Sequence, residues 1–369
     1  MKNTTLFDPL QLGTLTLRNR VFMSPLTRNR AQPNGVPGPL ASTYYGQRAS
    51  AGLIITEATQ ISPMGQGYFN TPGIHSPEQI DGWKPVVDRV HASGGTIFLQ
   101  LWHVSRISHT SLLPGGVQPV APSAIRANSQ TFITSGSVPV SEPRPLTLDE
   151  IRETAKDYRA AAANARRAGF DGVELHAANG YLIDQFLRTG ANQRTDDYGG
   201  SAENRIRFLI EALEAITAEW DPKSIGVRLS PLSTFNDMRD ADPEETFSTA
   251  FKHLDTFGLA YLHVVERVRD TRENDPGAKA IINRLRKLWS GVYIANSGYD
   301  GATGEESVRI GHADAIAFGR LFLANPDLPH RLQQGLPLNV PDHNSFYGGT
   351  EKGYTDYPTW DGNQVAPEK

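Results

Sequence analysis

The sequence contains no cysteine, which excludes disulfide bridges, thiolate zinc sites, iron–sulfur clusters and thiol nucleophiles. It also has no apolar run approaching the roughly 18 residues that a membrane-spanning helix needs. The amino end lacks the apolar stretch followed by small residues that is typical of a secretory signal. These absences predict a cytoplasmic protein with no membrane partner, whose chemistry depends on neither thiols nor clusters.

Charge of one sign is not in excess either. The formal net charge of the 369 residues is −4, and no basic stretch gives the electrostatic footprint of a nucleic-acid-binding protein. We therefore expect no nucleic-acid partner. The length alone allows two domains, but a single α/β barrel with insertions also reaches this size, so the pattern of elements has to decide.

Short strand-like runs alternate with longer helical patterns along the whole chain. The runs that read as strands are Arg20–Ser24, Gly52–Thr56, Thr96–Leu101, Gly172–His176, Ile225–Leu229, Tyr261–Val264, Val292–Asn296 and Ala315–Phe318. The helical patterns include Leu40–Ala49, Glu78–Ala92, Leu148–Ala168, Ala202–Trp220, Pro243–Phe257 and Ala278–Trp289. Strand-then-helix units in this number favour a closed (β/α)₈ TIM barrel over an open doubly wound sheet, so we predict one α/β domain over residues 1–369.

Additional segments surround this predicted barrel. Leu6–Leu17, with a turn at Gly13, is typical of a β-hairpin that could close the amino-terminal mouth of the barrel. Two long insertions, Ser105–Leu146 between strand 3 and helix 3 and Glu266–Gly277, are candidates for lids or binding surfaces, although surface decoration is about as common. Residues 364–369 are expected to form a disordered tail.

The stretch from Gly172 to Tyr181 carries the most chemical information. It runs from a buried strand into a turn that holds His176, Asn179 and Tyr181. In a barrel, the side chains that follow the strands meet at one mouth, so these three can converge on one substrate atom. Two neutral donors aimed at one oxygen would polarise a carbonyl or nitro group, and a nearby phenol could deliver a proton, which favours redox or enolate chemistry over hydrolysis.

Other strand ends are polar as well. Each residue has a structural interpretation: glycines 298 and 319 suit tight turns, Arg228 suits an ion pair, Thr27 suits a cap, and His176 with Asn179 suits a core histidine and an Asx turn. Gly319 and Arg320 follow the eighth predicted strand, where TIM barrels commonly bind phosphate, and a guanidinium there would neutralise charge.

Two other enzyme classes fit less well. A metal hydrolase would need a third and fourth ligand beside Glu174 and His176, or beside His103 and His109, and no such spacing is present, so we predict no metal. A Schiff-base aldolase would need a lysine at a strand end. Lys84, Lys252 and Lys287 all lie on helical patterns instead.

The motifs at the strand ends, taken together and in order, resemble the Old Yellow Enzyme family of FMN-dependent ene-reductases. The resemblance extends from Leu6 to Pro358 and rests on Pro25-Leu26-Thr27-Arg28, Gln100-Leu101-Trp102-His103, His176-Ala-Ala-Asn179-Gly-Tyr181, Phe318-Gly319-Arg320 and the Gly353–Pro358 segment. It implies a tightly bound FMN and an NAD(P)H-dependent flavin oxidoreductase. The branch that reduces dienoyl-CoA is excluded, because it carries a cysteine-bound iron–sulfur cluster.

The resemblance also implies roles in flavin binding. Arg228 matches the residue that faces flavin N1 and O2, where its charge stabilises the anionic reduced ring, and Thr27 matches the hydroxyl bonded to O4. Gln100 would meet the pyrimidine edge, Ala58 would leave room for the ring, and the remaining members of the cofactor set are Pro25, Leu26, Asn296, Ser297, Gly298, Gly319 and Arg320, with the phosphate beside Arg320.

For catalysis, the resemblance implies that His176 and Asn179 hold the oxygen of an α,β-unsaturated carbonyl or nitro compound. Hydride from flavin N5 would reach the β-carbon, and Tyr181 would protonate the α-carbon. Tyr68, Trp102 and Tyr347 match aromatic positions on the substrate side of the flavin. Some relatives carry a second histidine where this chain has Asn179, and an amide cannot become cationic, so polarisation here should depend less on pH at that position.

Alternatives stay open for the substrate. Nitrate esters or nitroaromatics are possible acceptors on the same scaffold, and so is a non-catalytic flavin-binding barrel, although Tyr181 and the two donors would then have no function. No Gly-x-Gly-x-x-Gly motif follows a strand and opens a helix, so NADPH or NADH is expected to bind transiently above the flavin. The sequence favours neither a monomer nor a homo-oligomer.

Overall fold

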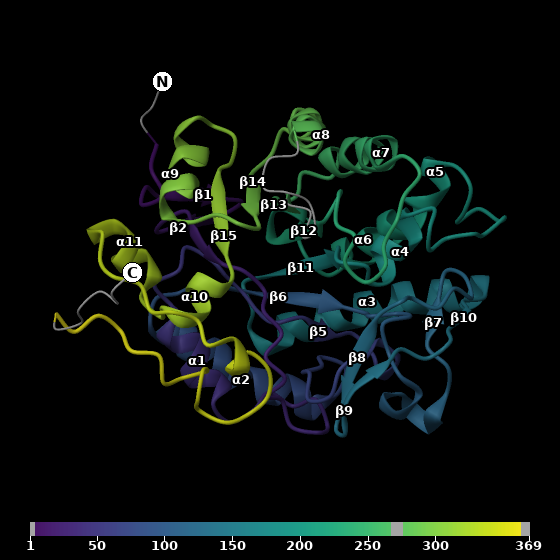
Figure 1. Cartoon of the computed structure of the whole chain (residues 1–369), viewed down its shortest axis with the longest axis horizontal. Coiled ribbons are helices and arrows are strands. Elements are labelled where there is room, and N and C mark those ends of the chain that lie inside the picture. Colours follow the sequence, from purple (N-terminus) through teal and green to yellow (C-terminus); the bar gives the residue numbers. More distant parts are fainter. Residues whose placement is uncertain (1–3, 267–275, 363–369) are drawn as a thin grey trace.

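A closed parallel barrel forms the centre of the molecule in the computed structural model, which describes residues 4–266 and 276–362 (Figure 1). Strand β11 is hydrogen-bonded to β12 on one side and to β6 on the other, which closes the ring β11-β12-β13-β14-β15-β3-β4-β6. The barrel strands are β3 (Val21–Met23), β4 (Ile54–Ile55), β6 (Ile97–Trp102), β11 (Gly172–Ala177), β12 (Ile225–Leu229), β13 (Tyr261–Val265), β14 (Tyr293–Asn296) and β15 (Ala315–Phe318). The predicted (β/α)₈ barrel and its eight strands are confirmed.

The register of these strands brings polar residues together inside the barrel. Glu174 lies beside Gln100 on one neighbouring strand, His176 lies beside Arg228 on the other, and Arg228 lies beside His263. Since alternate residues of a strand share a face, these side chains form a polar layer toward the carboxyl ends of the strands. The apolar floor below them and the polar layer above them together fill the barrel.

Helices surround the barrel. They are α1 (Ala41–Gln47), α2 (Pro77–Ala92), α3 (Leu148–Ala168), α4 (Leu182–Leu187), α5 (Ala202–Arg205), α6 (Arg207–Thr217), α7 (Pro243–Asp255), α8 (Pro276–Arg286), α9 (Gly301–Arg309), α10 (Arg320–Ala324) and α11 (Leu328–Gln334). Those over the predicted helical patterns differ from the prediction mainly at their ends, and α4, α9, α10 and α11 were not predicted. The single helix predicted over 202–220 was wrong in one respect: it is divided at Ile206. Arg205 there donates to Leu187 O and to the Thr246 hydroxyl, two contacts that fix the short first segment.

The predicted amino-terminal hairpin closes the bottom of the barrel. Its strands β1 (Leu10–Leu12) and β2 (Leu15–Leu17) pair in antiparallel fashion around Gly13, which has φ +55°. The leucines of the hairpin pack against inward-pointing residues from the lower halves of the barrel strands, including Phe22, Phe98 and Tyr261. This apolar contact covers the mouth opposite the carboxyl ends of the strands.

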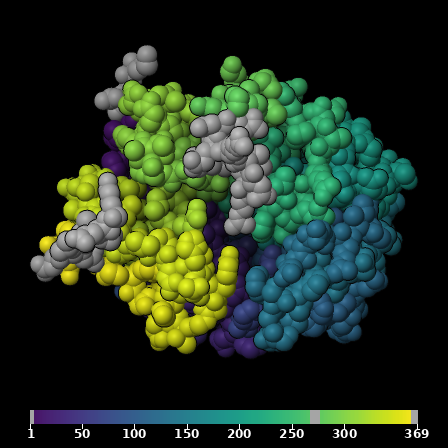
Figure 2. Space-filling view, viewed as in Figure 1, coloured from purple at the N-terminus to yellow at the C-terminus, as the bar shows by residue number. Residues whose placement is uncertain are grey.

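The insertion between strand β6 and helix α3 has regular structure of its own. It contains the parallel pair β7 (Val120–Ala121) and β10 (Arg144–Pro145) and the hairpin of β8 (Gln130–Ile133) and β9 (Gly136–Pro139). Outside the insertion, the short strand β5 (Thr59–Gln60) pairs with β6 in parallel fashion. In the space-filling view, the blue insertion and the yellow carboxyl-terminal segment face each other across a furrow (Figure 2). Two chain segments far apart in sequence therefore border one entrance.

Parts of two expectations fall outside the described ranges: residues 267–275 of the second insertion, and the predicted tail at 364–369. Across the two ranges that the structure describes, no helix combines the length and the apolar character needed to cross a membrane.

Candidate active site

His176 lies at the carboxyl end of β11, and its ring hydrogen bond identifies its tautomer. Its Nδ1 accepts the backbone N–H of Ala178 at 3.3 Å. Burial lowers the pKa of His176 well below 6.5, and the nearby charge of Arg228 acts in the same direction. The ring is therefore neutral with Nδ1 as an acceptor, so the proton resides on Nε2. This Nε2–H has no protein acceptor among the described residues and is free to donate.

Asn179 presents a second free donor three residues later. Its backbone has φ +58°, a left-handed conformation that asparagine tolerates better than most residues. The backbone N–H donates to the Ser230 hydroxyl at 2.8 Å, and the carbonyl accepts from Asn236 Nδ2 at 2.9 Å. The half-buried side-chain amide forms no hydrogen bond within the described part of the chain. The turn thus fixes the backbone of Asn179 and leaves its amide available.

Tyr181 completes the turn, immediately before α4. Its ring packs edge-on against His176, with 5.1 Å between ring centroids, and against Trp102 at 5.0 Å. Its hydroxyl lies 3.1 Å from the hydroxyl of Tyr68. Burial raises the pKa of Tyr181 to about 12, although the hydrogen bond with Tyr68 acts in the opposite direction. The phenol therefore keeps its proton at neutral pH. The structure brings the three predicted catalytic residues together.

Aromatic rings continue from this turn to the surface. Tyr68 stacks on Trp102 at 5.8 Å and contacts Phe132 at 6.5 Å, and Phe132 stacks on Tyr347 at 6.3 Å. Tyr347 is 59% exposed and Phe132 is 44% exposed, so the outer end of this row faces solvent. Phe132 belongs to β8 in the insertion and was not predicted. No sequence signal indicated it, because its contact with Tyr68 arises only from the fold of the insertion.

Beneath this turn, Gln100 and Glu174 belong to the polar layer of the barrel. Gln100 Nε2 donates to one oxygen of Glu174 at 2.7 Å, and His263 Nδ1 contacts the other oxygen at 2.8 Å. From sequence, Glu174 was interpreted only as a possible metal ligand, and His263 was not predicted. Gln100 still has its Oε1 and one N–H free to meet a ligand.

Arg228 and Asn296 form a second buried pair in this layer. Arg228 Nη2 donates to Asn296 Oδ1 at 2.9 Å, and Asn296 Nδ2 donates to Ala317 O at 2.7 Å. The side chain of Asn296 is thus turned into the barrel, and only its backbone could serve the phosphate site to which it was assigned. The Nε of Arg228 is buried without a partner in the described ranges, which fits a missing acceptor from a bound ring.

The loops after β14, β15 and β3 suit the rest of a flavin nucleotide. Ser297 and Gly298 have φ +85° and +78°, so the chain turns sharply after β14, and the glycine allows a ligand to approach the backbone closely. Arg320 is exposed at the start of α10 and pairs with no described residue. An added Cβ at Gly319 would lie 3.4 Å from Leu26, and the half-buried Thr27 hydroxyl forms no hydrogen bond with a described residue. Pro25, just before Leu26, and Ala58, after β4, are buried.

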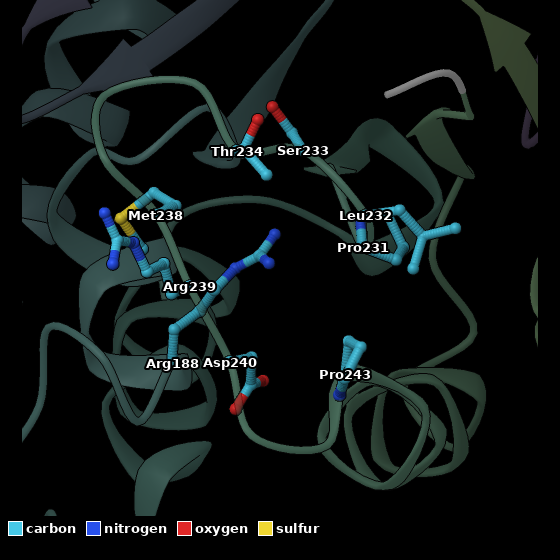
Figure 3. Close-up of a pocket in the computed structure, with 9 residues that line it drawn as sticks. All are labelled: Arg188, Pro231, Leu232, Ser233, Thr234, Met238, Arg239, Asp240 and Pro243. Atoms are coloured by element: carbon cyan, nitrogen blue, oxygen red, sulfur yellow. The ribbon is translucent and has the colours of Figure 1, made fainter. Parts of the chain in front are cut away.

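A separate cavity of about 260 Å³ lies outside this constellation (Figure 3). It is lined by the loop after β12 and by Arg188, and none of the predicted site residues contributes to it. Within residues 4–266 and 276–362, no group of three or more histidine and carboxylate side chains is arranged to hold a metal. The carboxylate of Glu174 is instead occupied by Gln100 and His263.

Comparison with known proteins identifies the family of the chain. Residues 5–339 match the NADH:flavin oxidoreductase / NADH oxidase family. The chain is 46% identical to 12-oxophytodienoate reductase 1 of Oryza sativa subsp. japonica over 96% of this chain and 92% of that protein. It is 39% identical to 12-oxophytodienoate reductase 2 of Arabidopsis thaliana, with coverage of 97% and 96%.

Solved structures extend the likeness to the whole fold. Morphinone reductase superposes with a TM-score of 0.94 at 48% identity, covering 99% of this chain and 98% of that one, and it has also been solved with tetrahydroNAD. An old yellow enzyme homologue from Zymomonas mobilis gives a TM-score of 0.92 at 42% identity, with coverage of 96% and 99%. The chain belongs to the NADH:flavin oxidoreductase / NADH oxidase family and is an Old Yellow Enzyme type oxidoreductase that uses FMN and a nicotinamide cofactor.

Proposed function

We propose that the enzyme reduces the activated C=C bond of α,β-unsaturated carbonyl or nitro compounds with electrons from NADPH or NADH. One observation carries the proposal: a single turn presents the free Nε2–H of His176, the free amide of Asn179 and the protonated phenol of Tyr181. Those are the groups required to hold an oxygen and to protonate a carbon. The relatives named for 12-oxophytodienoate and morphinone support the same substrate class.

His176 and Asn179 hold the substrate oxygen. Negative charge grows on that oxygen as the double bond is reduced, and both donors interact more strongly with the charged oxygen than with the neutral one. Their orientation is set before substrate arrives, since His176 is fixed through Nδ1 and Asn179 through its backbone. Removal of one preorganised donor of this kind typically raises the barrier by about 3 kcal/mol.

Tyr181 is the acid that protonates the α-carbon. Its high pKa keeps the phenol neutral, so a proton is available whenever substrate is bound. Tyr68, whose hydroxyl lies 3.1 Å away, steadies the phenol and stabilises the oxyanion that forms once the proton has left. Tyr68, Trp102 and Tyr347 also form the aromatic wall against which the substrate lies.

FMN, when bound, supplies hydride from N5 to the β-carbon and is reduced again by the nicotinamide. Thr27, Gln100 and Arg228 would hold its ring, Pro25, Leu26 and Ala58 would border it, and the phosphate would be held by Ser297, Gly298, Gly319 and Arg320 together with the backbone of Asn296. Arg228 keeps its charge inside the barrel, although burial lowers its pKa, because Glu174 lies nearby. That positive charge favours an anionic reduced ring.

A phenol titration tests the oxygen-holding pair. A para-substituted phenol whose oxygen is held by both donors should lie over the flavin and produce a charge-transfer absorption band. In the double variant His176→Ala/Asn179→Ala, with FMN bound, we expect the band to disappear at phenol concentrations that saturate the wild type. An unchanged titration would remove the assignment of both residues.

A further inference from the structure

The turn that carries Asn179 and Tyr181 is held in an unusual backbone conformation. Asn179 and Gly180 both have positive φ, +58° and +75°. A Cβ at Gly180 would lie 2.7 Å from Asn236 Cβ and 2.9 Å from Phe235 O, so the loop after β12 presses directly on the turn. Asparagine and glycine adopt left-handed backbone more readily than other residues, and contacts from surrounding groups fix the pair in one position.

Every backbone polar group of Asn179 and Gly180 is bonded to a side chain from elsewhere. Ser230 and Asp184 accept the two N–H groups, each at 2.8 Å. Asn236 and Gln185 donate to the two carbonyls at 2.9 Å and 2.7 Å. The Asn-Gly sequence favours this backbone conformation, and these four side chains hold it in place.

Asp184 is the centre of this network. Its carboxylate is fully buried, and besides Gly180 N–H it accepts the Ser230 hydroxyl at 3.3 Å and Arg188 Nε at 2.8 Å. Arg188 also donates to the backbone carbonyl of Ser230, so the guanidinium ties both residues together. Figure 3 shows Arg188 among the residues that line the separate cavity.

The direction of these hydrogen bonds requires a carboxylate at position 184. The backbone N–H of Gly180 can only donate, and it donates to the same carboxylate oxygen that accepts the Ser230 hydroxyl. The second carboxylate oxygen accepts a hydrogen bond from Arg188 Nε. An asparagine has only one acceptor oxygen, so its amide nitrogen would face either the donor Arg188 or the donors Ser230 and Gly180.

We propose that Asp184 is a positioning residue for the reaction, acting with Ser230 to hold the Asn179 amide and the Tyr181 phenol where substrate meets them. This inference rests on the proposed roles of Asn179 and Tyr181. Asp184 is fully buried and is not one of the groups assigned to substrate or flavin. It acts through the two backbone N–H groups of the turn, directly at Gly180 and through Ser230 at Asn179.

The test compares Asp184→Asn with a matched control, Asp327→Asn. Asp327 and Arg331 form the same kind of pair, four residues apart at 2.7 Å with a buried arginine, but at α11. Both proteins are prepared with FMN, and three quantities are measured: the Kd of a para-substituted phenol, and the rates of flavin reduction by NADPH and of its reoxidation by cyclohexenone.

For Asp184→Asn we expect the phenol Kd to rise and reoxidation to slow, each by roughly tenfold or more, while flavin reduction is unchanged. Asp327→Asn should lower thermal stability without changing any of the three. Ser230→Ala, which removes the acceptor of Asn179 N–H with little change in volume, should reproduce the Asp184→Asn pattern and serves if that variant does not fold. The proposal is overturned if both network variants keep wild-type values, or if Asp327→Asn behaves as they do.

A fourth measurement separates this proposal from the proposed function. Amide hydrogen exchange at Asn179 and Gly180 should accelerate in Asp184→Asn and Ser230→Ala but not in Asp327→Asn. If the wild type binds no phenol and does not reduce the enone, the proposed function fails. The positioning proposal is then judged by exchange alone, and unchanged exchange in both network variants overturns it.

Discussion

Individual residues at this site have distinct tasks, and Tyr181 is the easiest to isolate. Its phenol is needed only when the α-carbon is protonated, so Tyr181→Phe should slow flavin reoxidation by an enone and spare flavin reduction by NADPH. General acids of this kind typically contribute on the order of a hundredfold or more in rate. Stopped-flow absorbance of the flavin follows both half-reactions. Equal losses in both would contradict the assigned role.

His176 leads to a prediction about pH. Because its pKa lies well below 6.5 in the folded protein, the ring stays neutral while the pH falls through the usual range of imidazole titration. Enone reduction should therefore show no step between about pH 6 and about pH 7 that depends on His176. Stopped-flow rates for the wild type and His176→Asn test this. A step in the wild type that the variant lacks would show that the imidazolium forms.

Site residues that are close together in the sequence could be predicted, whereas contacts between residues far apart in the sequence could not. His176, Asn179 and Tyr181 could be predicted because a barrel places strand ends at one mouth. Partners from distant strands could not, since the Glu174–His263 contact joins residues 89 positions apart and neither motif spacing nor periodicity reports it. Phe132 was missed for a related reason: its ring meets Tyr68 only through the fold of the insertion.

Among the elements, helix α3 is stabilised by side-chain contacts at its amino end. Thr147 and Glu150 form a capping box there, and Arg144 binds both oxygens of Glu150 at 2.7 and 2.9 Å. The hydrogen bonds with Arg144 are the main cause that lowers the pKa of Glu150 from 4.5 to about 2. A lowered carboxyl pKa stabilises the fold above pH 4.5, and this contribution is lost as the pH falls toward 2.

We therefore expect Glu150→Ala to lower the free energy of unfolding by about 1 kcal/mol at neutral pH, and by progressively less in acid. Urea denaturation at several pH values measures this. Glu153→Ala, which removes an exposed pair with Lys156 on the same helix, should change stability little at any pH. A Glu150→Ala effect that is constant from neutral pH into acid would contradict the ionic part of the account.

Other elements could not be located from sequence. The helix α9 was not predicted, because its glycines and polar residues give a weak apolar pattern, yet Asp300 caps it and it packs beside β15. The short helices α4, α10 and α11 were likewise absent from the prediction. The hairpin β8–β9 has only one buried position, Thr131, so no alternation of buried and exposed residues revealed it.

At the scale of the whole molecule, the predicted architecture is confirmed. The barrel is closed, the amino-terminal hairpin covers its lower mouth, and the strand ends open beneath the insertion and the carboxyl-terminal segment. The meeting of those two segments could not be foreseen, since it depends on loops that cross the barrel mouth from opposite ends of the chain. The cytoplasmic location stays a prediction from composition.

The central claim is that this barrel binds FMN and passes electrons from NAD(P)H to an activated alkene. Anaerobic absorbance spectroscopy of the purified protein tests it most directly. We predict a flavin spectrum that bleaches when NADPH or NADH is added and returns when cyclohexenone follows. A colourless protein that takes up no added FMN, or a reduced flavin that the enone cannot reoxidise, would contradict the account.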